Sequence, residues 1–264
     1  MGQRGVTPST RLLATSVLLV TVVPLGGCVV PGSGGSPGTP EVRAAAAEPA
    51  PTPAERVAPS RAAASSRLPF DRTAHSTTSP ASLWVIVNKT HPLPASYRPD
   101  LGIVRGYQVA RPLVDPLERL LGGAGDDGVR FKIASAFRSY AYQRGVYQAQ
   151  VADVGRAAAD RVSARPGHSE HQTGLAVDLI TPDDPGCDFR ACFGQHNGGR
   201  WVARHAWEYG FVVRYTAATE DVTGYQAEPW HLRYVGSALA RELHDHPATL
   251  EEFFDVPGGG YPRR

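Results

Sequence analysis

Apolar and polar positions from residue 83 onwards follow two periods, and each period predicts one kind of element. Short β-branched or aromatic runs predict strands, and apolar residues three or four apart predict helices. The predicted strands cover residues 83–87, 129–137, 175–180, 211–215 and 231–235. The predicted helices cover residues 112–121, 140–154, 201–209 and 237–244, with Ser139 as an N-cap and with Gly122 and Gly210 as stops. Because strict strand–helix–strand alternation is absent, we expect an α+β fold with a mainly antiparallel sheet flanked by helices.

The start of the chain has a different pattern. Two arginines precede residues 12–24, which are mostly apolar but too short for a comfortable membrane span, and Leu25-Gly26-Gly27-Cys28 follows. This order resembles a bacterial lipoprotein signal peptide, residues 1–28, in which Cys28 receives the lipid. The alternative is an uncleaved anchor helix with an incidental cysteine. Both interpretations place the remainder outside the cytoplasm, and the first anchors it to the outer face of the cell membrane.

Composition then divides the rest of the chain. Residues 29–80 are rich in Pro, Gly, Ser and Ala and almost lack large apolar residues, so we expect a disordered tether. Residues 81–256 are long enough for one globular domain, and residues 257–264 are expected to form a flexible tail.

Charge and cysteine content limit the classes of function and the compartment that fit this chain. A net charge of +2 on 264 residues argues against a dedicated nucleic-acid binder, which would carry a basic stripe. The chain has three cysteines. If Cys28 carries lipid, Cys187 and Cys192 remain, and an oxidising compartment would pair them. The alternative is two free, buried thiols.

Two segments carry the candidate chemistry, and Asp178 stands out in the first. It lies within the apolar run Leu-Ala-Val-Asp-Leu-Ile, where a buried carboxylate is costly unless it is paired or bound to a metal. An arginine partner is one explanation. His171 offers another, because Gly174 permits a turn that brings this histidine back towards the strand. Ala176 shares a strand face with Asp178 and leaves room beside it.

The second segment adds His231 and Glu228. A lone histidine among apolar neighbours is more often a hydrogen-bonded core residue than a ligand, and Glu228 taken alone fits a solvated surface acid. Two imidazoles and one carboxylate, however, are a common catalytic zinc set that leaves a fourth position open. Glu228 stands three residues before His231, with Pro229 fixing the backbone between them, which suits a general base. His168 is the main rival ligand.

These segments together resemble the VanY-type zinc D-alanyl-D-alanine carboxypeptidases. That family has Ser-x-His-x-x-Gly-x-Ala-x-Asp followed by Glu-Pro-Trp-His, and both patterns occur here in full, beginning at Ser169 and at Glu228. The resemblance covers most of residues 83–236. It departs mildly before Arg138-Ser139, where the family has Gly-Tyr and this chain has Ala136-Phe137.

The resemblance implies that His171, Asp178 and His231 bind one Zn²⁺ per chain and that Glu228 is the general base. It also implies the fold of the hedgehog signalling domain and of related D,D-peptidases, and a substrate role for Arg138. A guanidinium just before a helix start can hold a carboxylate or an oxyanion. The alternative for Arg138 is a structural ion pair. Further candidate substrate contacts are Gln143 and Ser169, and candidate pocket residues are Tyr225 and Trp230.

The implied function is removal of the C-terminal D-amino acid from peptidoglycan stem peptides by a monomer. An L,D-carboxypeptidase or an endopeptidase on the same zinc site is an alternative within enzymes. A non-catalytic wall-binding module is another, although such a module has no need of Glu228. A serine-type penicillin-binding enzyme is excluded, because neither Lys89 nor Lys132 completes a Ser-x-x-Lys motif. If Glu228 is not the base, Glu170 and Asp183 are the nearest acids in sequence.

Overall fold

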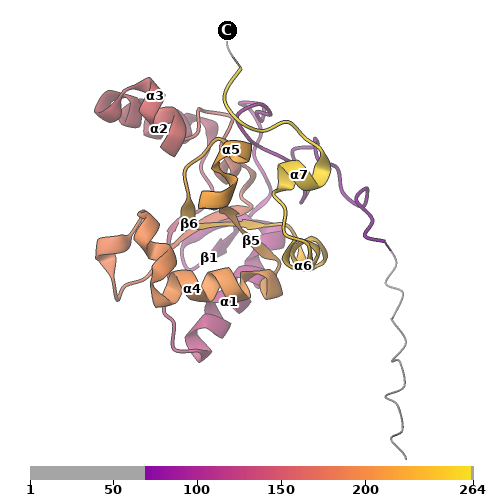
Figure 1. The fold of residues 1–264 in the computed structure, drawn as a ribbon, viewed down its shortest axis with the longest axis vertical. Coiled ribbons are helices and arrows are strands. Elements are labelled where there is room, and N and C mark those ends of the chain that lie inside the picture. Colours follow the sequence, from indigo (N-terminus) through magenta and orange to yellow (C-terminus); the bar gives the residue numbers. More distant parts are fainter. Residues whose placement is uncertain (1–68, 263–264) are drawn as a thin grey trace, which may run out of the picture. The chain divides into compact units, whose positions relative to one another are not determined.

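A four-stranded antiparallel sheet organises the protein in a computed structural model that describes residues 69–262 (Figure 1). The strands are β3 (Lys132–Ser135), β4 (Ala176–Ile180), β5 (Phe211–Tyr215) and β6 (Glu228–Tyr234), in the order β3-β4-β6-β5. A separate antiparallel hairpin joins β1 (Leu101–Val104) to β2 (Tyr107–Ala110). The predicted α+β class with an antiparallel sheet is therefore confirmed.

Helices flank this sheet. They are α1 (Val114–Asp126), α2 (Tyr140–Val154), α3 (Arg156–Val162), α4 (Asn197–His205), α5 (Glu220–Thr223), α6 (Ser237–Asp245) and α7 (Leu250–Phe254). Short 3-10 helices lie at Arg111–Leu113, Glu170–Thr173, Pro185–Cys187, Ala191–Gln195, Ala206–Tyr209 and Ala217–Thr219. Figure 1 shows α1 and α4 on one side of the sheet and the α2–α3 pair on the other. Within residues 69–262, no helix combines the length and apolar character needed to cross a bilayer.

The two faces of the sheet have opposite characters. Val177, Leu179 and Leu232 are fully buried on one face, where they pack in a single cluster with side chains of α1 and α4. Burying each such side chain contributes about 1.5–3 kcal/mol. The alternate residues Asp178, His231 and Arg233 point to the other face and are also buried. That second face therefore holds ionisable groups inside the protein, and each of them needs a partner.

The segment 83–87, predicted to be a strand, is buried but is not a strand. Its apolar side chains divide between two small clusters, one of them with α6 and α7. The carbonyls of Leu83 and Val85 accept hydrogen bonds from Arg233 Nη2, at 2.9 Å each. A side chain thus satisfies the backbone groups that a neighbouring strand would otherwise pair, which is why the β-branched run misled the prediction.

Glycine placement produced a second difference. The helix predicted to stop at Gly122 is α1, which continues to Asp126. A side chain at Gly123 would meet the Tyr209 hydroxyl, so this glycine serves close packing inside the helix. Gly210, by contrast, ends the preceding helical segment at a φ of 87°, as predicted.

The domain is also wider than the predicted residues 81–256. Phe70, placed in the expected tether, packs against Trp84 with ring centroids 5.6 Å apart. Tyr261, placed in the expected flexible tail, accepts a hydrogen bond from the Arg165 backbone at 2.8 Å. Residues 69–80 and 257–262 therefore belong to the folded unit. The predicted signal peptide with Cys28, and the tether up to residue 68, lie outside the described residues.

Candidate active site

Asp178 and His231 face each other across the two central strands. They are direct partners in the antiparallel register of β4 and β6, so both side chains lie on the same face of the sheet. Asp178 Oδ1 lies 3.1 Å from His231 Nδ1. Backbone pairing alone thus fixes two of the three predicted metal ligands.

His171 reaches the same point from the 3-10 helix Glu170–Thr173. This helix ends at Gly174, whose φ of 70° turns the chain into β4. A Cβ on Gly174 would come within 2.7 Å of the Ala110 nitrogen, so the turn requires glycine for its space as well as for its backbone angle. The turn brings His171 Nε2 to 3.2 Å from Asp178 Oδ2.

The three side chains offer a donor set suited to a divalent cation. His171 Nδ1 donates to the Ala136 carbonyl at 2.7 Å, which leaves a buried Nε2 with no hydrogen-bond partner. His231 Nε2 is held by Glu170 Oε2 at 3.2 Å, so its Nδ1 faces Asp178. One ligand atom from each of His171, Asp178 and His231 lies within 4.8 Å of the others. Two oriented imidazoles and a carboxylate match the ligands of catalytic Zn²⁺.

The charges around His171, Asp178 and His231 also favour the binding of a cation. Burial lowers the pKa of His171 to about 4, so this imidazole is neutral and its lone pair is free. Burial opposes protonation of His231 as well, but the nearby Asp178 and Glu170 carboxylates outweigh it and raise the pKa of His231 to about 9. Carboxylates gathered around a buried imidazole create a negative potential that a metal ion would neutralise.

Glu228 joins the cluster because β6 carries a bulge. Tyr215 pairs with Glu228, whereas Val213 pairs with Leu232, so β6 has two extra residues between these pairs. Residues three apart on a regular strand point to opposite faces. The bulge at Pro229-Trp230 turns Glu228 back, and its Oε2 lies 3.7 Å from His231 Nδ1. Bulges commonly re-aim a side chain beside an active site.

Glu228 has the acidity expected of a proton carrier. Burial raises its pKa, the positive charges of His231 and Arg138 oppose the rise, and Asp178 and Glu170 add to it. The result is a pKa of about 7. A carboxyl group with a pKa near neutrality can both accept and release a proton at physiological pH.

Arg138 lies immediately before the N-cap of α2. Ser139 Oγ accepts from the Tyr142 backbone at 3.2 Å, so the predicted cap is confirmed, and α2 has the predicted bounds. The Arg138 backbone donates to the His171 carbonyl at 3.1 Å, and the side chain lines the same cavity. Its Nε is buried without a partner, and no ion pair to Arg138 occurs within residues 69–262. The structural ion pair considered for this residue is therefore not observed there.

A cavity of about 680 Å³ surrounds these groups. Ser169, Tyr225 and Trp230 line it, as the sequence suggested. Gln143 does not: it is buried, and its Nε2 donates to the Ala164 carbonyl at 2.7 Å. In this structure the amide holds α2 against the segment after α3, and the substrate contact at Gln143 stays a prediction.

The rival candidates are engaged by other partners. His168 Nδ1 donates to the Asn88 carbonyl at 2.9 Å, and this histidine lines a different cavity. Asp183 forms an exposed ion pair with Arg130. Glu170 is fully buried against two arginines. None of the three is therefore placed to carry protons for a reaction beside Asp178 and His231.

Glu170, which the sequence offered only as an alternative base, instead supports the site through buried contacts that the sequence did not indicate. Its Oε1 accepts from Arg214 Nε and from Arg233 Nη1, at 2.9 Å each, while its Oε2 orients His231. Arg214 also pairs with Glu251 at 2.6 Å. The only available signal was the presence of arginines inside two apolar strands, because the partners are far apart in sequence.

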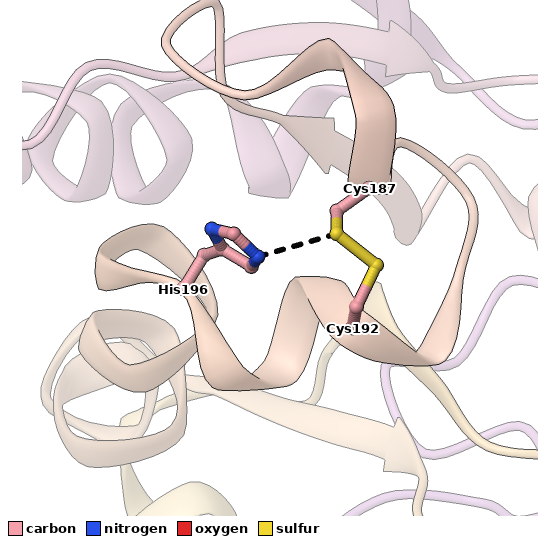
Figure 2. Close-up of side chains that lie close together, drawn as sticks. All are labelled: Cys187, Cys192 and His196. Carbon is pink, nitrogen blue, oxygen red and sulfur yellow. Dashed lines mark hydrogen bonds between the residues drawn. A yellow bond between two sulfur atoms is a disulfide. The ribbon is translucent and has the colours of Figure 1, made fainter. Parts of the chain in front are cut away.

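A disulfide-closed loop forms another part of the cavity rim. Cys187 and Cys192 are bonded, and Figure 2 shows the His196 ring pointing at this bridge, with Nε2 3.2 Å from Cys187 Sγ. Since the two sulfurs bind each other, this trio does not offer thiolate ligands to a metal. Inside the loop, Phe189 has a φ of 54°, lines the cavity and packs edge-on against Trp230.

Known proteins are similar to this chain in sequence and in fold. The family VanY, described as D-alanyl-D-alanine carboxypeptidase, matches residues 107–237. YodJ of Bacillus subtilis (strain 168) is 36% identical over 187 residues, which cover 67% of this chain and 68% of YodJ.

Two solved structures are similar in sequence and in fold. The LD-carboxypeptidase LdcB has a TM-score of 0.62 and 34% identity, over 68% of this chain and 89% of that one. A mutant of the vancomycin resistance D,D-pentapeptidase VanY, in complex with Zn(II), has a TM-score of 0.57 and 31% identity, over 64% of this chain and 97% of that one.

Proposed function

The chain belongs to the VanY family of D-alanyl-D-alanine carboxypeptidases and is a hydrolase, and from that premise we propose that it uses one Zn²⁺ to remove the C-terminal D-amino acid from peptidoglycan stem peptides. The observation that carries this proposal is the cluster of His171, Asp178 and His231, with the unpartnered His171 Nε2 facing Asp178. Glu228 and Arg138 flank the cluster in one cavity.

His171, Asp178 and His231 would hold the metal. When bound there, Zn²⁺ supplies Lewis-acid polarisation of a carbonyl and makes water more acidic. Glu170 keeps the His231 ring oriented through Nε2, and Ala136 does the same for His171 through Nδ1. Such outer hydrogen bonds fix the tautomer and the direction of each ligand.

Glu228 carries the proton in this proposal. Its carboxylate takes a proton from the attacking water and then gives it to the departing amine of the D-amino acid. Arg138 provides an uncompensated positive charge in the same cavity, suited to the substrate carboxylate or to the oxyanion that develops at the scissile carbonyl. A wall-binding module without catalysis has no use for a buried carboxyl group beside the proposed metal ligands.

Specificity is the finer part of the proposal. A D,D-carboxypeptidase releases D-alanine from a pentapeptide stem, whereas an L,D-carboxypeptidase releases it from a tetrapeptide stem. The similarity to the LD-carboxypeptidase LdcB favours the second activity as an alternative, and an endopeptidase would cut inside a cross-linked peptide. Mass spectrometry of both stems and of cross-linked muropeptides after incubation with zinc-loaded protein separates the three. The proposal requires loss of one alanine from the pentapeptide, and an unchanged pentapeptide would contradict it.

We also propose that the protein is a monomeric lipoprotein on the outer face of the cell membrane. The support is the sequence Leu25-Gly26-Gly27-Cys28 after a short apolar run. The native protein should partition into detergent with the membrane, and Cys28→Ser should release it and remove the lipid mass. Unchanged attachment and mass in that variant would contradict the proposal. Light scattering of the purified domain tests the monomer.

A further inference from the structure

A second cavity, of about 1150 Å³, lies outside the active site. We call it the basic cavity. Its cationic lining consists of Lys89, Arg144, Arg156, Arg161 and Arg165. Asp160 is the one carboxylate among its lining residues. A concave surface with such an imbalance concentrates positive potential and attracts anions.

Most of this positive charge has no partner among residues 69–262. Asp160 is already engaged by Arg165, at 2.7 Å, and by the Tyr147 hydroxyl, also at 2.7 Å. Within residues 69–262, no side-chain hydrogen bond or ion pair engages the exposed guanidinium groups of Arg144, Arg156 and Arg161. These three groups stay available to a ligand.

The inner wall is built rather than merely exposed. Lys89 is 3% exposed, and its Nζ donates to the Gly224 carbonyl and lies 4.2 Å from the centre of the Tyr225 ring. The Arg165 guanidinium lies 3.9 Å from the centre of the Tyr261 ring. Packed rings hold both cations in place, so little conformational entropy is lost when an anion binds. Burial lowers the pKa of Lys89 to about 8, consistent with a buried cation that lacks a carboxylate neighbour in direct contact.

The basic cavity and the active site share a wall. Val146 and Gln150 of α2 line the active-site cavity, while Arg144 and Gln148 of the same helix line the basic cavity. Tyr225 lines the active site and supports Lys89 from behind. For a polymer that carries peptides at intervals and enters both cavities, the second contact would raise the effective concentration of the first.

We propose that the basic cavity binds the carboxylates of a neighbouring peptidoglycan stem peptide while the active site holds the peptide to be cut. This inference rests on the proposed function for the identity of the polymer. Guanidinium groups match carboxylates in a two-point geometry. Tyr140 and the exposed Pro92 add aromatic and apolar surface that suits the methyl groups and sugar faces of the wall better than it suits a bare phosphate chain.

The test compares two double variants with equal loss of charge. Arg144→Gln with Arg156→Gln alters the basic cavity, whereas Arg119→Gln with Arg204→Gln removes exposed arginines of α1 and α4 outside both cavities. Each protein is mixed with purified peptidoglycan sacculi, freed of phosphate polymers, in the presence of chelator so that no turnover is needed. Co-sedimentation gives the affinity.

We expect the cavity variant to bind these sacculi roughly five- to tenfold more weakly and the control to stay within about twofold of wild type. Hydrolysis of one soluble pentapeptide, which reaches only the active site, should stay within about twofold. Equal binding by the two double variants would overturn the proposal. So would a loss seen only with sacculi that retain phosphate polymers. Because binding is scored without turnover, failure of the proposed peptidase activity would appear separately, as absent pentapeptide cleavage with the binding difference intact.

Discussion

Replacement of Glu170 by glutamine keeps the shape of the side chain and removes one negative charge from the buried face of the sheet. In the wild-type protein this carboxylate lies 2.9 Å from both Arg214 Nε and Arg233 Nη1, and none of the three side chains is more than 1% exposed. Glu251 is the second carboxylate of this group, 2.6 Å from Arg214. The substitution therefore leaves two buried guanidinium groups with one carboxylate.

The expected cost is large. Removing one partner of a buried ion pair costs about 3–5 kcal/mol, because the remaining charge stays desolvated. The glutamine oxygen still accepts one hydrogen bond, so we expect the lower end, about 3 kcal/mol. Total stabilities are about 5–15 kcal/mol, so the loss is a substantial fraction. Urea unfolding in chelating buffer at pH 7 measures it.

The pH dependence of stability provides a second test of the Glu170 charge. Burial raises the pKa of Glu170, but Arg214, Arg233 and the hydrogen bond from His231 outweigh it and hold that pKa far below its usual value. A carboxyl group with a depressed pKa stabilises the fold fully above its unfolded pKa, about 4.3, and loses this contribution as the pH falls. The stability difference between wild type and Glu170→Gln should therefore shrink from about pH 5 towards pH 3.

Glu118→Gln is the matched control. Glu118 lies 3.6 Å from Arg105, and both side chains are 48% exposed. Exposed pairs contribute about 0–1 kcal/mol, so this variant should unfold almost as wild type does. If Glu170→Gln matches Glu118→Gln at pH 7, the buried charge cluster does not stabilise the protein and the reasoning is refuted.

Two further substitutions test the walls of the cavity. Arg138→Ala should lower kcat by about 10²–10³-fold if the guanidinium stabilises the oxyanion, and should mainly raise KM if it holds the substrate carboxylate equally in ground and transition states; unchanged steady-state kinetics would exclude both roles. Replacing Cys187 and Cys192 by serine should cost about 2 kcal/mol in urea unfolding and raise KM, because the loop presents Phe189 to the cavity. Wild-type stability and KM in that double variant would contradict the role of the loop.

Local signals in the sequence were sufficient to predict those elements whose ends are set by residues at the ends themselves. Ser139 caps α2 through its own hydroxyl, and Gly210 takes the positive φ that ends the helical segment before β5. The segment 83–87 failed because its carbonyls bond to Arg233, about 150 residues away in the chain. The β1–β2 hairpin was missed because its short strands bury few residues and so carry little apolar pattern.

The residues of the candidate site also differ in how far local sequence could predict their roles. His171, Asp178 and His231 were predicted as a set from the two motifs shared with the VanY-type carboxypeptidases, and Asp178 also stood out as a carboxylate inside an apolar run. The supporting role of Glu170 could not be predicted, since it depends on Arg214 and Arg233, which lie 44 and 63 residues further along the chain. The bond from the Gln143 amide to the Ala164 carbonyl could not be predicted either, because it is set by the packing of α2 on α3.

Turnover of the Glu228→Gln variant tests the proposed mechanism most directly. The amide keeps the shape of the side chain beside His231, at the bulge in β6, but cannot carry the proton. The measurement is kcat on a pentapeptide stem, with zinc content determined on the same preparation. We predict wild-type zinc content, close to one per chain, and a fall in kcat of at least about a hundredfold. A variant that holds zinc and retains more than about a third of wild-type kcat would contradict the assignment of Glu228 as the general base.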